Sequence, residues 1–294
     1  MIKTGLSARV KDFPRLARLL KSHPDVEIAW ITNNGSPARI ANIFPELTGD
    51  FDGTFIVEPD FEAIDLYIGP YTPRLAAYPD VKAILTDRPN DESFEVECGI
   101  PEFCRKALVR GARATVIPGQ TELLGALALM PLARNLLLNG AVGGSAVLAS
   151  DDSRPSAAAL GRHVSAEAFD RLSREILSQL QTSFASPFKV LSFTTAEDVA
   201  MATFTVESRT PLPEVWRMYH QFYDDHRHVV LVEDPVSSLK ASMVRDTNKA
   251  VVSLSSDDST LYITVLLDAR MKQGAGMAIH LLNLLFGLHE LTGF

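Results

Sequence analysis

The turn Pro118-Gly119-Gln120 is the stretch of this chain whose predicted shape could support chemistry. An apolar run, 112–117, enters it, and a helix-like apolar segment follows it. A strand, a sharp turn and a helix N-terminus would aim the residue after the glycine into a cleft, beside backbone N–H groups and the positive end of a helix dipole. Enzymes use such a turn for a nucleophile, but the amide of Gln120 is not nucleophilic at neutral pH.

A second candidate site is the small-residue segment 139–145, which ends in Gly144 and Ser145. Such a segment can let backbone amides surround a small anion. It can equally be a plain linker into a second domain. Further along, Arg162 and His163 precede a helix that the apolar spacing predicts over 165–182.

The cysteines and one cluster of histidines favour structural roles. Cys104 is predicted on a helix and Cys98 in a loop with a route to solvent, and neither has a histidine nearby in the sequence. One histidine-rich corner comprises His220, His226 and His228 with Asp224 and Asp225. It lacks a clear tetrahedral set of ligands, so we interpret it as a solvated turn and predict no metal site.

The elements that position these residues begin with a strand at 2–6, a helix at 12–22 and a strand at 26–31, which form a βαβ unit of a parallel sheet. Further predicted elements are strands at 54–58, 64–68 and 81–86 and a helix at 101–110. The turn after the first strand holds one glycine, so the usual pyrophosphate cradle is absent. In place of such a cradle, the side-chain charges of Arg9 and Lys11 could hold a phosphate in this turn.

Two other positions complete this weak cofactor-binding prediction. Ser7 lies in the same turn as Arg9 and Lys11. Gly69 lies beyond the carboxyl end of the strand at 64–68, where open α/β sheets bind their ligands.

From 188 the pattern changes to alternating strands with one interrupting helix at 211–224. The predicted strands are 188–193, 199–209, 228–232, 239–245, 250–255 and 260–267. We therefore predict a Rossmann-like α/β domain, 1–118, completed by a C-terminal helix, 271–294. The second domain, 119–270, is predicted as α+β with a mostly antiparallel mixed sheet.

Composition limits the partners. The 294-residue chain has 46% hydrophobic residues and a formal charge of −8, with a pI near 5.4. This balance and the lack of a basic run argue against nucleic acid. No apolar segment reaches the roughly 18 residues that a membrane span needs, so we expect no membrane association. Two cysteines favour a reducing compartment, and we expect the cytoplasm.

Several stretches together resemble the N-acetyl-gamma-glutamyl-phosphate reductases of arginine biosynthesis, in the semialdehyde dehydrogenase superfamily. The segment 268–287 resembles the family's D-N-L-x-K-G-A-A-G-Q-A-V-Q-x-x-N-x-x-F-G, and 98–102 resembles Y-G-L-P-E. Gly161-Arg162-His163, followed by Glu167, is similar to H-R-H-x-P-E. Residues 1–3 and 23–28 resemble the family's first βαβ unit, so the resemblance spans nearly the whole chain.

The resemblance implies a fold whose chemistry has changed. In the family, the turn A-N-P-G-C-Y-P-T holds the cysteine that forms a thioester, which NADPH reduces; here Gln120 takes the cysteine's place. The glycine-rich nucleotide loop has no match near 6–13. Of the family's catalytic set only His163 is kept. We therefore expect no cofactor or weakly bound NADP, a homo-oligomer (dimer or tetramer), and a small anionic ligand near Gly144, Ser145 and Arg162.

Three functional interpretations follow. The leading one is a diverged paralogue without reductase activity, in a binding, regulatory or structural role. The second is an active NADP-dependent reductase, for which Cys98 would have to supply the thiol. The third is a different small-molecule enzyme that uses His163, Glu122 and Ser145 in the same cleft.

Overall fold

The computed structural model describes residues 1–33, 35, 37–150, 162–163, 166–185, 187–195, 197–233 and 238–294, and of residues 162, 163, 166 and 167 it describes the backbone alone. The chain divides into two compact units. One comprises Met1–Pro118 with Gly274–Phe294, and the other comprises Gly119–Gln273. Among the described helices, none has both the length and the apolar character that crossing a bilayer requires.

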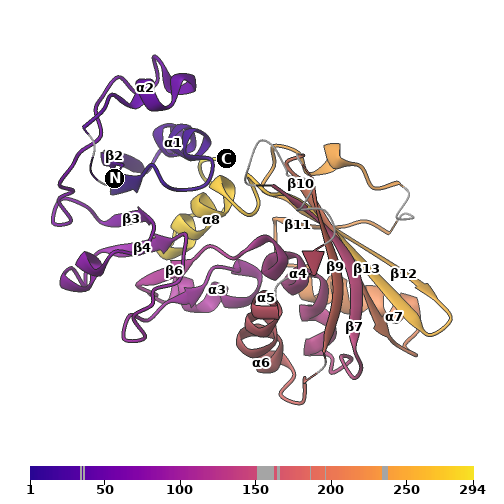
Figure 1. The fold of residues 1–294 in the computed structure, drawn as a ribbon. Coiled ribbons are helices and arrows are strands. Elements are labelled where there is room, and N and C mark those ends of the chain that lie inside the picture. Colours follow the sequence, from indigo (N-terminus) through magenta and orange to yellow (C-terminus); the bar gives the residue numbers. More distant parts are fainter. Residues whose placement is uncertain are drawn as a thin grey trace. The chain divides into compact units, whose positions relative to one another are not determined.

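The first unit is built on a six-stranded sheet with the strand order β2-β1-β3-β4-β6-β5, in which every pairing is parallel. The strands are β1 (Ile2–Ser7), β2 (Val26–Thr32), β3 (Leu66–Gly69), β4 (Lys82–Leu85), β5 (Glu97–Cys98) and β6 (Ala114–Val116). The helices α1 (Phe13–Ser22) and α3 (Pro101–Val109) both contact the C-terminal helix α8 (Ala275–Leu285), drawn in yellow in Figure 1. Shorter helical turns are α2 (Ile40–Ile43), η1 (Pro45–Leu47) and η2 (Pro73–Ala77).

Two predictions in this unit are wrong. The expected strand at 54–58 does not form. Thr54 and Ile56 make isolated bridges instead of a ladder with a neighbouring strand, and residues 56–58 are exposed. Conversely, Cys98 lies in the short strand β5 rather than in a loop, because it pairs with Val116 at the edge of the sheet.

The second unit is built on a seven-stranded mixed sheet with the order β11-β12-β13-β10-β7-β9-β8. Its strands are β7 (Val142–Ala149), β8 (Arg162–His163), β9 (Phe188–Thr195), β10 (Val199–Glu207), β11 (Val229–Leu231), β12 (Ala250–Asp257) and β13 (Thr260–Asp268). Most pairings are antiparallel, while β7–β9 and β11–β12 are parallel. The predicted fold class, a parallel Rossmann-like sheet plus a mixed sheet, is confirmed.

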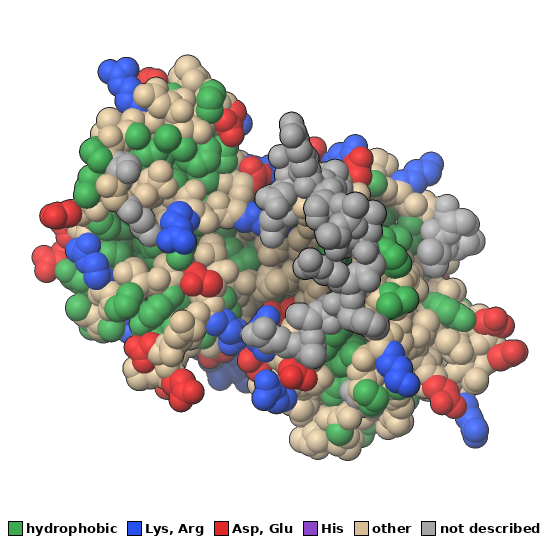
Figure 2. All heavy atoms as spheres, viewed as in Figure 1, with side chains coloured by type: hydrophobic (Ala, Val, Ile, Leu, Met, Phe, Trp, Pro, Cys, Tyr) green, Lys and Arg blue, Asp and Glu red, His purple; other side chains and the backbone are tan. Residues whose placement is uncertain are grey.

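The helices of this unit are α4 (Gln120–Arg134), α5 (Ala166–Arg171), a π-helical turn (Leu172–Leu177), α6 (Ser178–Leu180) and α7 (Leu212–Tyr223). The first residue of the predicted helix 165–182 lies outside the described residues. The predicted strand 239–245 is wrong, because that segment forms the short turn η6 (Ala241–Met243). On the face shown in Figure 2, acidic and basic side chains are interspersed among the described residues.

A proline inside α4 fixes how this helix packs. Pro131 has no N–H, so it cannot donate the helical hydrogen bond to the carbonyl of Leu127. The hydroxyl of Tyr223, on α7, donates to that carbonyl at 2.6 Å, and Tyr219 donates to the carbonyl of Ala128. Full burial raises the pKa of Tyr219 well above its usual value. Tyr223 therefore replaces the hydrogen bond that the carbonyl of Leu127 loses to the proline, and Tyr219 binds the next carbonyl along the helix.

Candidate functional site

Gln120, at the position where chemistry was expected, joins two elements of the second unit. Its Nε2 donates to the carbonyl of Ala149 at 2.9 Å, and its Oε1 accepts from the N–H of Ala149 at 2.9 Å. Gln120 is the first residue of α4, and Ala149 is the last residue of β7. The side-chain amide thus pairs with the N–H and the C=O of one residue, as a residue of a neighbouring antiparallel strand would.

This pairing uses both polar atoms of the Gln120 side chain. The residue is half-buried, and Gly119, which precedes the helix, offers no side-chain cap. An amide that donates and accepts in this way holds the turn against the end of β7 but supplies no nucleophile or proton carrier. Nearby, Glu122 is buried, with 5% of its surface exposed.

Gly144 and Ser145, at the end of the segment 139–145, lie in a strand rather than in a plain linker. Both residues lie in β7, a central strand that pairs with β10 on one side and β9 on the other. Gly144 has a φ of +149°, and a Cβ there would lie 2.2 Å from the carbonyl oxygen of Thr203. The glycine therefore permits close approach between strands, while Ser145 is exposed on the sheet.

Arg162 and His163 form the edge strand β8, where they pair with Ser192 and Leu191 of β9. Leu191 in turn pairs with Ser145 of β7. The backbone positions of His163 and Ser145 are thus two strand spacings apart, roughly 10 Å. Ser145 is also four residues before the Ala149 end of β7, roughly 13 Å along the strand.

These spacings separate the predicted site residues of the second unit. The positions of His163, Ser145 and Gln120 do not converge on one point of the sheet. The acid–base or hydrolytic site predicted from His163, Glu122 and Ser145 therefore has no support in the strand register.

In the first unit, the structure brings together Ser7 and Gly69 at the carboxyl ends of β1 and β3. A Cβ on Gly69 would lie 2.6 Å from Cβ of Ser7 and 2.5 Å from the hydroxyl oxygen of Tyr67. Burial raises the pKa of Tyr67 to about 12, with the nearby Asp87 carboxylate adding to the rise. The hydroxyl donates to the carbonyl of Pro70 at 3.0 Å.

Tyr67 was not singled out from the sequence, although a tyrosine inside an apolar strand is a signal that its hydroxyl needs a polar partner. The Gln120–Ala149 pair gives no such signal, because nothing in the sequence links two residues so far apart. Arg9 is exposed and Lys11 is half-buried, both in the turn before α1.

In the histidine-rich corner, one histidine contacts a carboxylate. His220 Nε2 lies 2.7 Å from Glu233 Oε1 at an exposed position. The described residues contain no group of three or more metal-ligating side chains.

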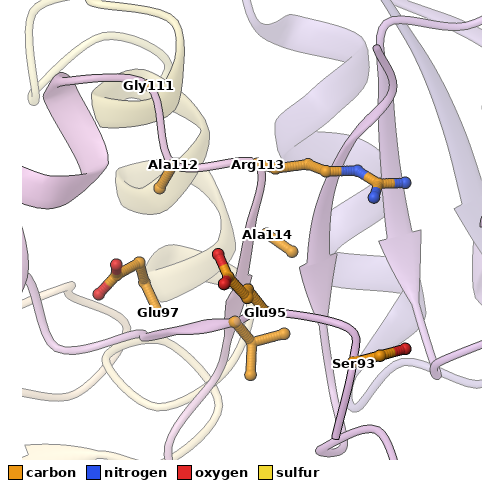
Figure 3. Close-up of a pocket in the computed structure, with 8 residues that line it drawn as sticks. Ser93, Glu95, Glu97, Gly111, Ala112, Arg113 and Ala114 are labelled. Carbon is orange, nitrogen blue, oxygen red and sulfur yellow. The ribbon is translucent and has the colours of Figure 1, made fainter. Parts of the chain in front are cut away.

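A cavity of about 630 Å³ lies at the amino ends of β5 and β6, lined by residues that include Glu95, Glu97 and Arg113. Arg113 points away from the two carboxylates (Figure 3) and donates to the carbonyl of Leu75 at 2.6 Å. Ligands of parallel sheets bind at the carboxyl ends, so this cavity is not the nucleotide crevice.

Comparison with known proteins gives these positions a context. Two curated relatives are the N-acetyl-gamma-glutamyl-phosphate reductases of Parabacteroides distasonis, 27% identical over 310 residues, and Bacteroides thetaiotaomicron, 28% identical over 307 residues. Each alignment covers 95% of this chain and 92% of the relative. The chain is a divergent relative of the N-acetyl-gamma-glutamyl-phosphate reductases. It matches no protein-family profile.

Solved structures share the fold at lower sequence identity. Aspartate semialdehyde dehydrogenase with NADP from Candida albicans has a TM-score of 0.71 and 13% identity, over 97% of this chain and 98% of that one. Aspartate semialdehyde dehydrogenase II of Vibrio cholerae, complexed with ASA, has a TM-score of 0.69 and 11% identity, over 98% of both chains. The chain therefore has the semialdehyde dehydrogenase fold, as the resemblance implied.

The turn between β1 and α1 does not fit the pyrophosphate of a dinucleotide in the usual way. Such a turn needs glycines so that backbone N–H groups can approach the phosphates. Here Ala8 and Val10 are each only 7% exposed. Asp12 precedes α1, with its Oδ2 3.0 Å from Arg15 Nε. Asp12 makes no side-chain cap to α1, and its carboxylate adds a negative charge to the turn in which a phosphate would bind.

Proposed function

We propose that this chain is a relative of the N-acetyl-gamma-glutamyl-phosphate reductases that keeps their fold but does not reduce an acyl phosphate through a thioester. It would act in a binding, regulatory or structural role. The observation that supports this proposal is the pairing of the Gln120 amide with both main-chain groups of Ala149, at 2.9 Å each. Where the resemblance places a nucleophilic cysteine, this chain has a side chain committed to holding two elements together.

The proposal for NADP binding depends on the turn between β1 and α1 in the first unit. One solved structure of the same fold is named with NADP, so an NADP-binding scaffold is reasonable for this chain. The turn around Ala8, Val10 and Asp12 argues against tight binding. We therefore propose that the chain binds NADP weakly or not at all, with Ser7, Arg9, Lys11 and Gly69 at the position of the crevice. A thermal-shift titration with NADP and NAD tests this, and a micromolar dissociation constant for either would contradict it.

The activity test uses N-acetyl-gamma-glutamyl phosphate, the substrate in the relatives' name, with NADPH. We expect no substrate-dependent oxidation of NADPH by the purified full chain. A measurable rate that survives replacement of both Cys98 and Cys104 by serine would show reduction without a thioester and would overturn the proposed binding, regulatory or structural role. A rate that is lost in Cys98→Ser alone would instead support an active reductase with Cys98 as its thiol.

We also propose that the chain is a homo-oligomer in which two copies meet through one face of the mixed sheet. Leu191 and Phe193 of β9 and Met201 of β10 are 48%, 42% and 38% exposed. Val147 pairs with both Phe193 and Met201, so these apolar side chains lie on one face in register. An apolar sheet face buried against its own copy makes an isologous interface.

Light scattering on a size-exclusion column tests the oligomer. We expect a mass of two or more chains for the wild type and a lower mass for Phe193→Lys. Met243→Lys is the matched control, because Met243 is 38% exposed in the turn η6 rather than on this face. A monomeric wild type would contradict the proposal.

A further inference from the structure

The two cysteines lie together at the junction of β5 and α3, although neither has a place in the proposed function. Cys98 ends β5, and Cys104 lies in the first turns of α3, which begins at Pro101. Both are free thiols; Cys98 is half-buried and Cys104 is buried. The chain has two cysteines in all.

The geometry at this junction brings the Cys104 sulfur to Cys98. The thiol of Cys104 donates to the main-chain carbonyl of Cys98, and it also donates to the carbonyl of Ile100 at 3.1 Å. Helical side chains point toward the N-terminus of their helix, which aims the Cys104 sulfur back at the β5–α3 connection. The sulfur of Cys104 therefore touches the backbone of the residue with which it would form a bond.

The environment supports an interaction between the two thiols themselves. Burial raises the pKa of Cys104 well above its usual value, and the hydrogen bond with the Cys98 side chain is the second cause. Cys104 therefore stays a protonated thiol beside Cys98, and the half-buried Cys98 is the sulfur that an oxidant reaches first. Gly99, which follows Cys98, lies close against β6, since a Cβ there would lie 2.1 Å from the carbonyl oxygen of Val116. A disulfide needs two residues whose side chains can meet without large backbone movement. The contact of the Cys104 sulfur with the Cys98 carbonyl supplies that approach.

We propose that Cys98 and Cys104 form a reversible intramolecular disulfide when a small peroxide reaches the half-buried Cys98. The Cys98 sulfur attacks one oxygen of hydrogen peroxide, so that an S–O bond forms and the O–O bond breaks. The leaving oxygen departs as water, with the proton from the Cys98 thiol. The buried Cys104 sulfur then attacks the sulfenic acid of Cys98, an S–S bond forms, and the S–O bond breaks.

The second leaving group departs as water with the Cys104 proton. In total, two thiols and one hydrogen peroxide give one disulfide and two waters, and two electrons pass from the sulfurs to the peroxide. The product closes a short loop that ties the start of α3 to β5. Because Cys98 pairs with Val116 at the end of β6, this loop lies beside the strand that leads into the Pro118-Gly119-Gln120 turn.

The test treats the folded full chain with hydrogen peroxide, removes the peroxide, and then titrates the thiols of treated and untreated chains after unfolding. We expect the titratable thiols to fall from two to none, the intact mass to fall by two hydrogens, and dithiothreitol to restore both thiols. The oxidised chain should also melt at a higher temperature, because the disulfide constrains the unfolded state. A peptide map under non-reducing conditions should show the 98–104 link.

Two single variants separate the steps. Cys98→Ser should leave the thiol of Cys104 unreacted in the folded chain, since Cys104 is buried. Cys104→Ser should stop at a sulfenic acid on Cys98, which dimedone traps. If Cys104→Ser does not fold, the wild-type peptide map decides the proposal by itself.

Three results would overturn it. The first is two thiols that persist in the folded chain under a treatment that oxidises the unfolded chain. The second is a sulfinic acid on Cys98 while Cys104 stays titratable. The third is a product that contains only disulfides between chains.

Discussion

Replacing Gln120 by glutamate tests the structural role of this position with almost no change in shape. The Nε2 donor to the Ala149 carbonyl becomes an oxygen, while the acceptor for the Ala149 N–H is kept. At neutral pH the introduced carboxylate would face a carbonyl oxygen with no proton between them. Removing one partner of a partly buried hydrogen bond costs about 1–3 kcal/mol, so Gln120→Glu should lower the free energy of unfolding by that amount.

The same variant should recover its stability in acid. A protonated carboxyl can donate to the Ala149 carbonyl, so the folded chain favours the protonated form and raises the pKa of the introduced group above the ~4.3 of an unfolded glutamate. A group with a raised pKa in the folded state contributes stability that is fully present below the unfolded pKa. That contribution is lost as the pH rises through the folded pKa. The deficit against wild type should therefore be small near pH 4 and reach its full size by about pH 7.

Urea unfolding at several pH values measures this difference, with Gln120→Ala as the matched control. The alanine variant loses both hydrogen bonds and should be destabilised by about 1–3 kcal/mol at every pH where the fold is intact. Two results would show that the pairing with Ala149 does not stabilise the turn. One is a Gln120→Glu variant as stable as the wild type at pH 7, and the other is a stability difference that does not change with pH. The proposed function would then lose its supporting observation.

Other parts of the structure make further predictions. Tyr223→Phe should lower the free energy of unfolding by about 1–3 kcal/mol, because it removes the donor to the Leu127 carbonyl, and thermal unfolding measures it. Gly144→Ala should lower the free energy of unfolding by about 3 kcal/mol or more, because the new Cβ would lie 2.2 Å from a backbone oxygen. The control is Gly143→Ala, whose Cβ would lie 2.5 Å from a side-chain hydroxyl. That hydroxyl can rotate away, so the control should be destabilised less. Burial raises the pKa of Tyr67 from 10.0 to about 12. The neutral Tyr67 hydroxyl therefore adds to the free energy of unfolding below pH 10, and this contribution is lost as the pH rises toward 12. Between those limits the wild type should lose up to ~3 kcal/mol more stability than Tyr67→Phe in unfolding titrations, and equal losses would contradict the assignment.

Much of the fold could be predicted because its signals are local. The spacing of Phe13, Leu16 and Leu20 predicted α1, and those residues form its buried face. The alternating or apolar runs of the second unit predicted β9, β10, β12 and β13. Where the local signal was weak, the prediction failed. The glycines of β7 look like a linker, and only pairing with strands on both sides makes that segment a central strand.

The sequence by itself determined that the turn at 118–120 has no nucleophile and that the turn after β1 lacks a glycine cradle, since both depend on which side chains are present. Only the tertiary structure decided what Gln120 does instead, because its partner is a main-chain group 29 residues away. It also decided that His163 and Ser145 lie on different strands, with Leu191 between them. The physical reason is that hydrogen bonds join atoms that are close in space, and strand order, rather than position along the chain, sets which atoms are close.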